Sequence, residues 1–168
     1  NPRLFYKEFK IPKSNGESRT ILSPQEPLVV LQRWILRKIL DRKRPHKVVC
    51  GFVKGRSVLD NARPHVGRKV VVRIDVKDFF PSVSFRQVRK VFEQLGYPYR
   101  VAVLLANLCT VDGALPQGAP TSPALSNLVC QKLDRRFVGL KKKLEFRYTR
   151  YADDLVFYSA LGIILGGR

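Results

Sequence analysis

Two adjacent carboxylates, Asp153 and Asp154, lie within the run Arg147 to Tyr158, which is otherwise rich in aromatic and β-branched residues. Residues of these types favour β-strands, so the doublet is predicted at a turn between two strands. Like charges a few ångströms apart repel each other unless a cation lies between them, and the pair therefore indicates a divalent metal site. The alternative is that Asp-Asp simply favours a tight turn.

A third carboxylate, Asp75, lies near the end of the apolar run Lys69 to Val76. This run is predicted to be a strand that is buried on both faces or central in a sheet. Alone, Asp75 is explained as a cap for the segment that follows. Together with the doublet it indicates magnesium, which prefers hard oxygen ligands and keeps positions open for phosphate oxygens. Two such ions can activate a 3′ hydroxyl and stabilise a leaving pyrophosphate, and Mn²⁺ can substitute for Mg²⁺.

The chain is strongly basic, with 32 Lys and Arg against 13 Asp and Glu among 168 residues and a formal net charge of +19. A compact chain with this charge repels itself unless a polyanion or counterions screen it, and nucleic acid is the expected partner. A membrane surface is not expected, because the basic residues are dispersed and no apolar run approaches the roughly 18 residues of a membrane span.

Cysteine usage indicates a reducing compartment. Cys50, Cys109 and Cys130 are far apart, and with only His46 and His65 available they form no zinc-binding spacing. Their apolar neighbours suggest small buried side chains. The amino terminus carries no signal-peptide pattern, so a cytosolic protein is expected.

The elements that must position the aspartates follow from periodicity and turn residues. Strands are expected over residues 5–11 and 18–22, joined by a turn with Asn15-Gly16, and over 145–151 and 155–159 around the doublet. Helices are expected for about 14 residues after Pro27, and over 57–62, 84–95, 99–110 and 123–138. No linker divides the chain, which indicates one domain over 1–168. The glycine-rich segment 160–168 is interpreted as a truncation point.

Three segments together resemble the motifs of reverse transcriptases. Asp75 to Pro81 resembles the first catalytic motif, Leu115 to Pro123 (Leu-Pro-Gln-Gly-Ala-Pro-Thr-Ser-Pro) the template- and nucleotide-positioning motif, and Tyr151-Ala-Asp-Asp154 the catalytic hairpin. The resemblance implies an α+β fold, the fingers and palm of a right-hand polymerase, with an antiparallel palm sheet backed by helices and no thumb. It assigns fingers to about 1–68, palm to 69–81 and 115–168, and fingers and palm helices to 82–114.

A fourth segment, Asn61-Ala-Arg-Pro-His65, resembles the Asn-Ala-x-x-His element of bacterial retron reverse transcriptases. In that group the region is associated with recognition of the cognate structured RNA, which makes Asn61 and His65 candidate RNA-binding residues. The alternative is a hydrogen-bonding pair at a helix end. Other basic residues, such as Arg42, are expected to follow backbone phosphates rather than read bases.

Carried over by position, the resemblance makes Asp75 and Asp153 the principal ligands of two magnesium ions. Asp154 becomes a closely associated carboxylate, and the Val76 carbonyl completes one site. All three aspartates are thereby the expected catalytic residues.

The same resemblance assigns four nucleotide-binding residues. Phe80 matches the aromatic gate that excludes a ribose 2′ hydroxyl, and Gln117 would contact the incoming nucleotide. Arg19 and Lys13 match residues that hold the triphosphate, the arginine through its planar fork and the lysine as a point charge. Each has a simpler alternative: Phe80 as a core aromatic, Gln117 as a turn residue, and the two cations as solvated surface charges.

The first functional hypothesis is an RNA-directed DNA polymerase of retron type in the bacterial cytoplasm. It would bind deoxynucleoside triphosphates, a noncoding RNA template and the nascent DNA, and the resemblance extends to phage defence with an unidentified effector. The second is a group II intron-like or other bacterial reverse transcriptase. The third is a non-catalytic RNA-binding module that retains the palm fold. Activity of the 168 residues alone is not expected without the thumb.

Overall fold

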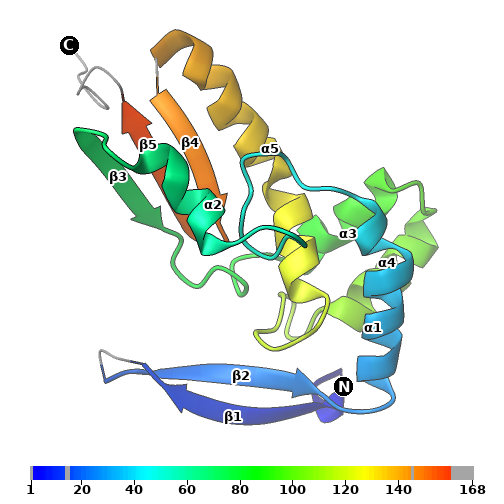
Figure 1. Ribbon diagram of the computed structural model, residues 1–168. Helices are drawn as coiled ribbons and strands as arrows, with labels where there is room; N and C mark the ends of the chain where they lie inside the picture. The colour runs from blue at the N-terminus through cyan, green and yellow to red at the C-terminus, as the bar shows by residue number, and fades with distance from the viewer. Residues whose placement is uncertain (1, 14–15, 145, 160–168) are drawn as a thin grey trace. The chain divides into compact units, whose positions relative to one another are not determined.

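The computed structural model describes residues 2–13, 16–144 and 146–159 (Figure 1). The interpretation of 160–168 as a truncation point concerns residues outside this description. The chain divides into two compact units, Asn1–Arg44 with Asp78–Val129 and Pro45–Lys77 with Cys130–Arg168. We call them the helical unit and the sheet unit, and each is described by itself.

The helical unit begins with a short 3₁₀ turn, Pro2–Phe5, and an antiparallel hairpin of β1 (Tyr6–Pro12) and β2 (Ser18–Pro24). Three helices follow: α1 (Leu28–Lys38), α3 (Phe85–Gln94) and α4 (Tyr99–Cys109). The first part of α5 (Ser122–Leu144) also belongs to this unit. The predicted hairpin and the helices after Pro27, Ser84 and Pro98 are confirmed.

The core of the helical unit is made where these helices present their apolar stripes to one another. Its most buried members include Ile35 of α1, Phe92 of α3, Ala106 of α4 and Leu125 of α5, each at most 2% exposed. Helix α3 begins at a capping box, in which the Ser84 hydroxyl accepts from the Gln87 amide and the Gln87 side chain accepts from the Ser84 amide.

The sheet unit contains β3 (Val70–Asp75), β4 (Phe146–Tyr151) and β5 (Asp154–Ser159), with β5 hydrogen-bonded between the other two (Figure 1). All pairs are antiparallel. Helix α2 (Val58–Ala62) begins at a capping box on Ser57 and continues into the 3₁₀ turn Arg63–His65. The confirmed elements thus include the short helix and the two strands around the aspartate doublet.

The two faces of this sheet are covered by different helices. On one face Tyr148 and Phe157 pack with Phe137 of α5. Side chains alternate along a strand, so Thr149 lies on the opposite face, where His65 contacts it. The sheet is therefore sandwiched between α5 and the segment that contains α2.

The prediction that the strand ending at Asp75 is central or buried on both faces is wrong. In the described residues β3 pairs with β5 alone and forms an edge of the sheet. Val71 and Ile74 are 45% and 49% exposed. An apolar β-branched run favours a strand, but its exposure depends on which neighbours cover it, and these come from elsewhere in the chain.

Candidate functional site

The three predicted catalytic aspartates meet at one end of the sheet unit. Asp75 is the register partner of Asp154 across β3 and β5, and directly opposed residues share a face of the sheet. Asp153 lies in the two-residue connection between β4 and β5, and its carbonyl accepts a hydrogen bond from the Val76 amide at 3.1 Å. Pairing of the strands thus gathers residues 78 or more positions apart in the chain into one site.

Arg73 is a member of this site that the sequence reasoning missed. Its Nε and Nη2 donate to Oδ1 and Oδ2 of Asp154 at 2.7 and 2.9 Å. This hydrogen bonding, with the negative charge of Asp154, raises the pKa of Arg73. The signal was present in the sequence, because Arg73 and Asp75 are two positions apart in a strand and therefore share a face.

The donor set fits a magnesium ion that shares its coordination with a substrate. The described residues contain no group of three or more His, Cys, Asp or Glu side chains arranged around a common metal position. Asp154 is engaged by Arg73, and Asp75 and Asp153 are the other two carboxylates of the predicted set. Magnesium is commonly bound through one or two carboxylates together with substrate phosphates, and this pair has that chemistry.

The backbone of the hairpin turn is unusual. Ala152 has a φ of 57°, a left-handed conformation that is unfavourable for residues with a Cβ. The backbone of Gly51 lies against it, since a Cβ at position 51 would be 2.3 Å from the Ala152 nitrogen. Only glycine permits this approach, so the loop before α2 and the turn carrying Asp153 are fitted together.

A buried ion pair lies on the α5 face of the same hairpin. Arg150 donates from Nε and Nη2 to the two carboxylate oxygens of Asp134, at 2.9 Å each, and the two side chains are 1% and 0% exposed. Tyr148 donates to Asp134 at 2.8 Å. Burial, reinforced by the Asp134 carboxylate, raises the pKa of Tyr148. Burial by itself lowers the pKa of Arg150, but hydrogen bonding to Asp134 and its negative charge outweigh this effect, so the pKa of Arg150 is raised. The sequence reasoning missed this pair.

One predicted nucleotide-binding residue, Gln117, lies in a loop that is attached to the strand carrying another, Arg19. The Gln117 carbonyl accepts from the Leu22 amide at 2.8 Å, which attaches its loop to β2. Gly118 follows with a φ of 122°, and a Cβ there would lie 2.8 Å from Ile21 Cγ2. Arg19 is exposed on the same strand, so the loop of Gln117 and the strand of Arg19 are held in a fixed relation.

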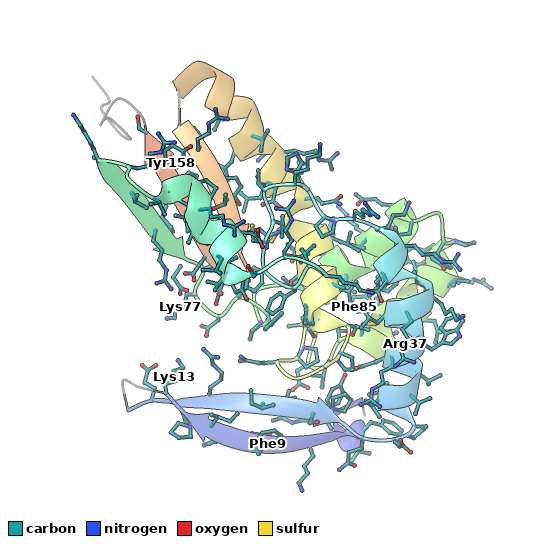
Figure 2. The ribbon with its side chains drawn as sticks, viewed as in Figure 1. Phe9, Lys13, Arg37, Lys77, Phe85 and Tyr158 are labelled. Carbon is teal, nitrogen blue, oxygen red and sulfur yellow. The ribbon has the colours of Figure 1, made fainter. Side chains whose placement is uncertain are left out.

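The other two predicted nucleotide-binding residues have partners of their own in the helical unit. Lys13, near the hairpin tip (Figure 2), forms an exposed ion pair with Glu17 at 2.9 Å. Phe80 is half-buried, packs against the helical core and lies 5.4 Å, centroid to centroid, from the buried Phe79. Their predicted roles in nucleotide binding stay predictions.

Asn61 and His65 lie inside the sheet unit, each 9% exposed. His65 Nε2 lies 2.6 Å from Thr149 Oγ1. The same Thr149 hydroxyl donates to the Asn61 carbonyl at 3.5 Å. The His65 ring and the ring of Tyr158 on β5 are T-shaped, with their centroids 5.1 Å apart. Among the described residues, His65 and the Asn61 carbonyl both bond to Thr149 rather than to each other, and the RNA contact stays a prediction.

Acid should destabilise the fold through His65. Burial, followed by the charge of Arg68, lowers its pKa, and its Nδ1 has no hydrogen-bond partner among the described residues. As pH falls below about 6.5 the unfolded chain takes up a proton that the folded chain excludes, so stability decreases toward the lower folded pKa. Urea unfolding at pH values from 7.5 down to 5.5 measures this effect. The difference in unfolding free energy between the wild-type chain and the His65→Gln variant should shrink as the pH is lowered.

The direct check is a histidine titration by NMR, for which a His46→Gln variant assigns the two imidazole signals. A His65 pKa at or above the ordinary value of about 6.5 would contradict the expected acid effect.

Residues 11–161 match the family described as reverse transcriptase (RNA-dependent DNA polymerase). The retron Mx162 reverse transcriptase of Myxococcus xanthus is 44% identical over 90% of this chain and 35% of its own length. The retron Ec86 reverse transcriptase of Escherichia coli is 43% identical over 89% of this chain and 48% of its own length. The chain thus spans less than half of these curated relatives.

Solved structures with a similar fold include two telomerases at 13% sequence identity. That of Candida albicans, in complex with a fragment of telomeric RNA, has a TM-score of 0.58 over 92% of this chain and 38% of its own. Apo telomerase of Candida tropicalis, truncated from its C-terminal domain, has a TM-score of 0.61 over 92% of this chain and 43% of its own. At this identity the likeness concerns the fold, and it agrees with the expected α+β fingers and palm.

Cys50, Cys109 and Cys130 are free cysteines, and among the described residues no helix is both long and apolar enough to span a bilayer. The aspartates at the end of β3 and in the β4–β5 hairpin, with the match over residues 11–161, show that this chain belongs to the reverse transcriptase family.

Proposed function

We propose that this chain carries the fingers and palm of an RNA-directed DNA polymerase of retron type, which copies a structured noncoding RNA into DNA. The observation that carries the proposal is the register of β3 and β5, which sets Asp75 opposite Asp154 beside the turn of Asp153. The retron subtype is supported by the 43–44% identity to retron reverse transcriptases. The activity is proposed for the longer protein in which this chain is continued by a thumb.

The reverse transcriptase family uses divalent metal ions, and the finer proposal is two Mg²⁺ ions, with Mn²⁺ as a substitute. Asp75 and Asp153 would hold them, with the Val76 carbonyl completing one site. When bound, the ions would supply activation of the primer 3′ hydroxyl and stabilisation of the leaving pyrophosphate. Asp154, oriented by Arg73, would add negative charge to the site without itself being a principal ligand.

Deoxynucleoside triphosphates are the proposed substrates. Gln117 would contact the incoming nucleotide, from a loop that its carbonyl bond to Leu22 keeps in place. Arg19 would bind triphosphate oxygens through its planar fork. Lys13 would contribute a point charge once it exchanges Glu17 for phosphate.

The RNA partner would be held largely through its backbone, since the net charge of +19 favours phosphate contacts and makes binding sensitive to salt. Asn61 and His65 are proposed to take part in recognition of the cognate RNA by shaping the segment around α2, where they are buried. The retron assignment also carries the proposals of a bacterial cytoplasmic location, an effector and a role in defence against phage.

Primer extension on an RNA template tests the proposed activity. The full-length protein should extend a DNA primer with deoxynucleotides in the presence of Mg²⁺, and removal of the metal with EDTA should stop extension. RNA binding without extension, under all metal and primer conditions, would reject the polymerase and leave the RNA-binding module. An inverted-repeat noncoding RNA encoded immediately upstream would support the retron subtype, whereas a maturase-like thumb would favour a group II intron lineage.

Sugar selectivity tests the role of Phe80. Replacing Phe80 with Ala should raise incorporation of ribonucleotides relative to deoxynucleotides by about 10-fold or more, because a hydrophobic wall that rejects one added group contributes on the order of 1–3 kcal/mol. Single-nucleotide insertion with dNTP and rNTP measures the ratio. Phe79→Ala serves as the matched control, since Phe79 is the more buried ring, at 7% exposed, and its loss should lower stability without changing the ratio. An unchanged ratio in the Phe80 variant rejects the gate.

A further inference from the structure

The side chain of Arg150 bonds to the turn that carries Asp153, from the face of the sheet that α5 covers. Its Nη1 donates to the carbonyl of Ala152 at 2.9 Å, while Nε and Nη2 are taken by Asp134. One guanidinium thus joins helix α5 to the residue that immediately precedes Asp153. We infer that Arg150, oriented by Asp134, is a positioning residue that fixes the backbone of the turn carrying the catalytic aspartates.

Arg150 and the pair of Asp75 and Asp154 lie on opposite faces of the sheet, which distinguishes a positioning role from direct catalysis. Asp154 and its partner Asp75 share a face with Thr149, because Thr149 and Tyr151 alternate with Arg150 along β4. Arg150 lies on the other face, toward α5, where its side chain is 1% exposed. Its bond to the turn is made to the backbone carbonyl of Ala152, and it comes from the face of the sheet opposite to the side chains of Asp75 and Asp154.

The turn needs such support because of its own conformation. Ala152 is left-handed, with a φ of 57°, and a residue with a Cβ relaxes from this region unless its surroundings prevent it. The backbone of Gly51 lies against the Ala152 nitrogen, and the Val76 amide holds the Asp153 carbonyl at 3.1 Å. The Arg150 side chain adds a third contact, its hydrogen bond to the Ala152 carbonyl.

Asp134 gives the guanidinium its orientation. The carboxylate accepts from Arg150 through both oxygens and from Tyr148 at 2.8 Å, and it is 0% exposed. A planar fork bound in this way has one rotational setting, which directs Nη1 at the turn. Lysine carries the same charge but cannot bind both carboxylate oxygens and the Ala152 carbonyl in this geometry.

The inference rests on the proposed polymerase for its kinetic consequence, whereas its structural consequence is measured without any activity. In Arg150→Lys, hydrogen exchange of the Val76 amide, which is bonded to the Asp153 carbonyl, should accelerate by ~10-fold or more through local opening of the turn. The Leu115 amide, bonded to the Val83 carbonyl in the helical unit, reports global unfolding in the same experiment. A shift confined to Val76 supports the positioning role.

The kinetic arm uses the full-length protein and counts active molecules by a pre-steady-state burst. Arg150→Lys should lower kcat per active molecule by about 10–100-fold, the range found for residues that orient metal ligands, and leave the primer-template dissociation constant unchanged. Phe137→Leu is the matched control, because Phe137 packs on Tyr148 from the same helix as Asp134 without bonding to the turn. It should reduce stability and leave both kcat and the Val76 exchange ratio unaltered.

The outcomes separate the two hypotheses. If Val76 and Leu115 exchange change by the same factor and kcat per active molecule is unaltered, Arg150 has a merely structural role and the inference is overturned. If the wild-type full-length protein does not extend primers, the proposed function fails, while the exchange result still decides the positioning role. If Arg150→Lys does not fold, Asp134→Asn is judged by the same criteria, with a smaller change in the same direction expected.

Discussion

Replacing Asp153 with Asn in the full-length protein should lower nucleotide addition by about three orders of magnitude, equivalent to ~4 kcal/mol of transition-state stabilisation. The amide keeps the size of the side chain and the turn, but it removes one of the two carboxylates proposed to hold the metal ions. The loss should appear in kcat, because the developing charge on the reacting oxygens is no longer matched. Single-turnover primer extension with saturating primer-template measures it.

Asp112→Asn is the appropriate control for this prediction. Asp112 is an exposed aspartate with a φ of 50°, a conformation that asparagine adopts readily, and its partner is Arg3. Its replacement should leave extension unchanged. Activity of the Asp153 variant within a few-fold of wild type would remove Asp153 from the catalytic set and leave the doublet as a structural turn.

Separating the buried pair of Arg150 and Asp134 should produce the largest loss of stability in the chain. Asp134→Leu leaves a guanidinium that is 1% exposed without its counter-charge, and the expected loss is about 3–5 kcal/mol of unfolding free energy. Arg150→Met should cost a similar amount, since it strands the carboxylate. Urea unfolding of the chain at neutral pH measures both variants.

The double variant decides how the pair acts. Asp134→Leu with Arg150→Met replaces both charges by apolar groups, so it should recover most of the loss of either single variant, less the cost of the Tyr148 hydroxyl that loses its acceptor. Additive losses would show that the two side chains stabilise the unit independently. The positioning role of Arg150 does not depend on this result, because it concerns the geometry of the turn rather than the net stability.

Local chemistry explains most of what could be predicted about the fold. The serines that begin α2 and α3 and the proline before α4 each act within a few residues, and these elements lie where they were expected. The strands on either side of the predicted Asn15-Gly16 turn also pair as expected, while Asn15 itself lies outside the described residues. The edge position of β3 could not be predicted in this way. Its apolar run satisfied the pattern of a central strand, but burial is decided by what packs on the strand rather than by its own residues.

The sequence by itself indicated the family of this protein, because the identity and order of Asp75, Gln117, Asp153 and Asp154 resemble the motifs of reverse transcriptases. Only the tertiary structure decided which charged side chains form ion pairs at and beside this site. Arg73 and Asp154 are 81 positions apart and are joined by strand register, and Asp134 reaches Arg150 from a helix on the far face of the sheet. In a chain with 32 basic residues, the sequence does not distinguish a charged side chain that becomes buried from one that stays in water. The difference arises when folding removes water from around the charge and supplies a partner.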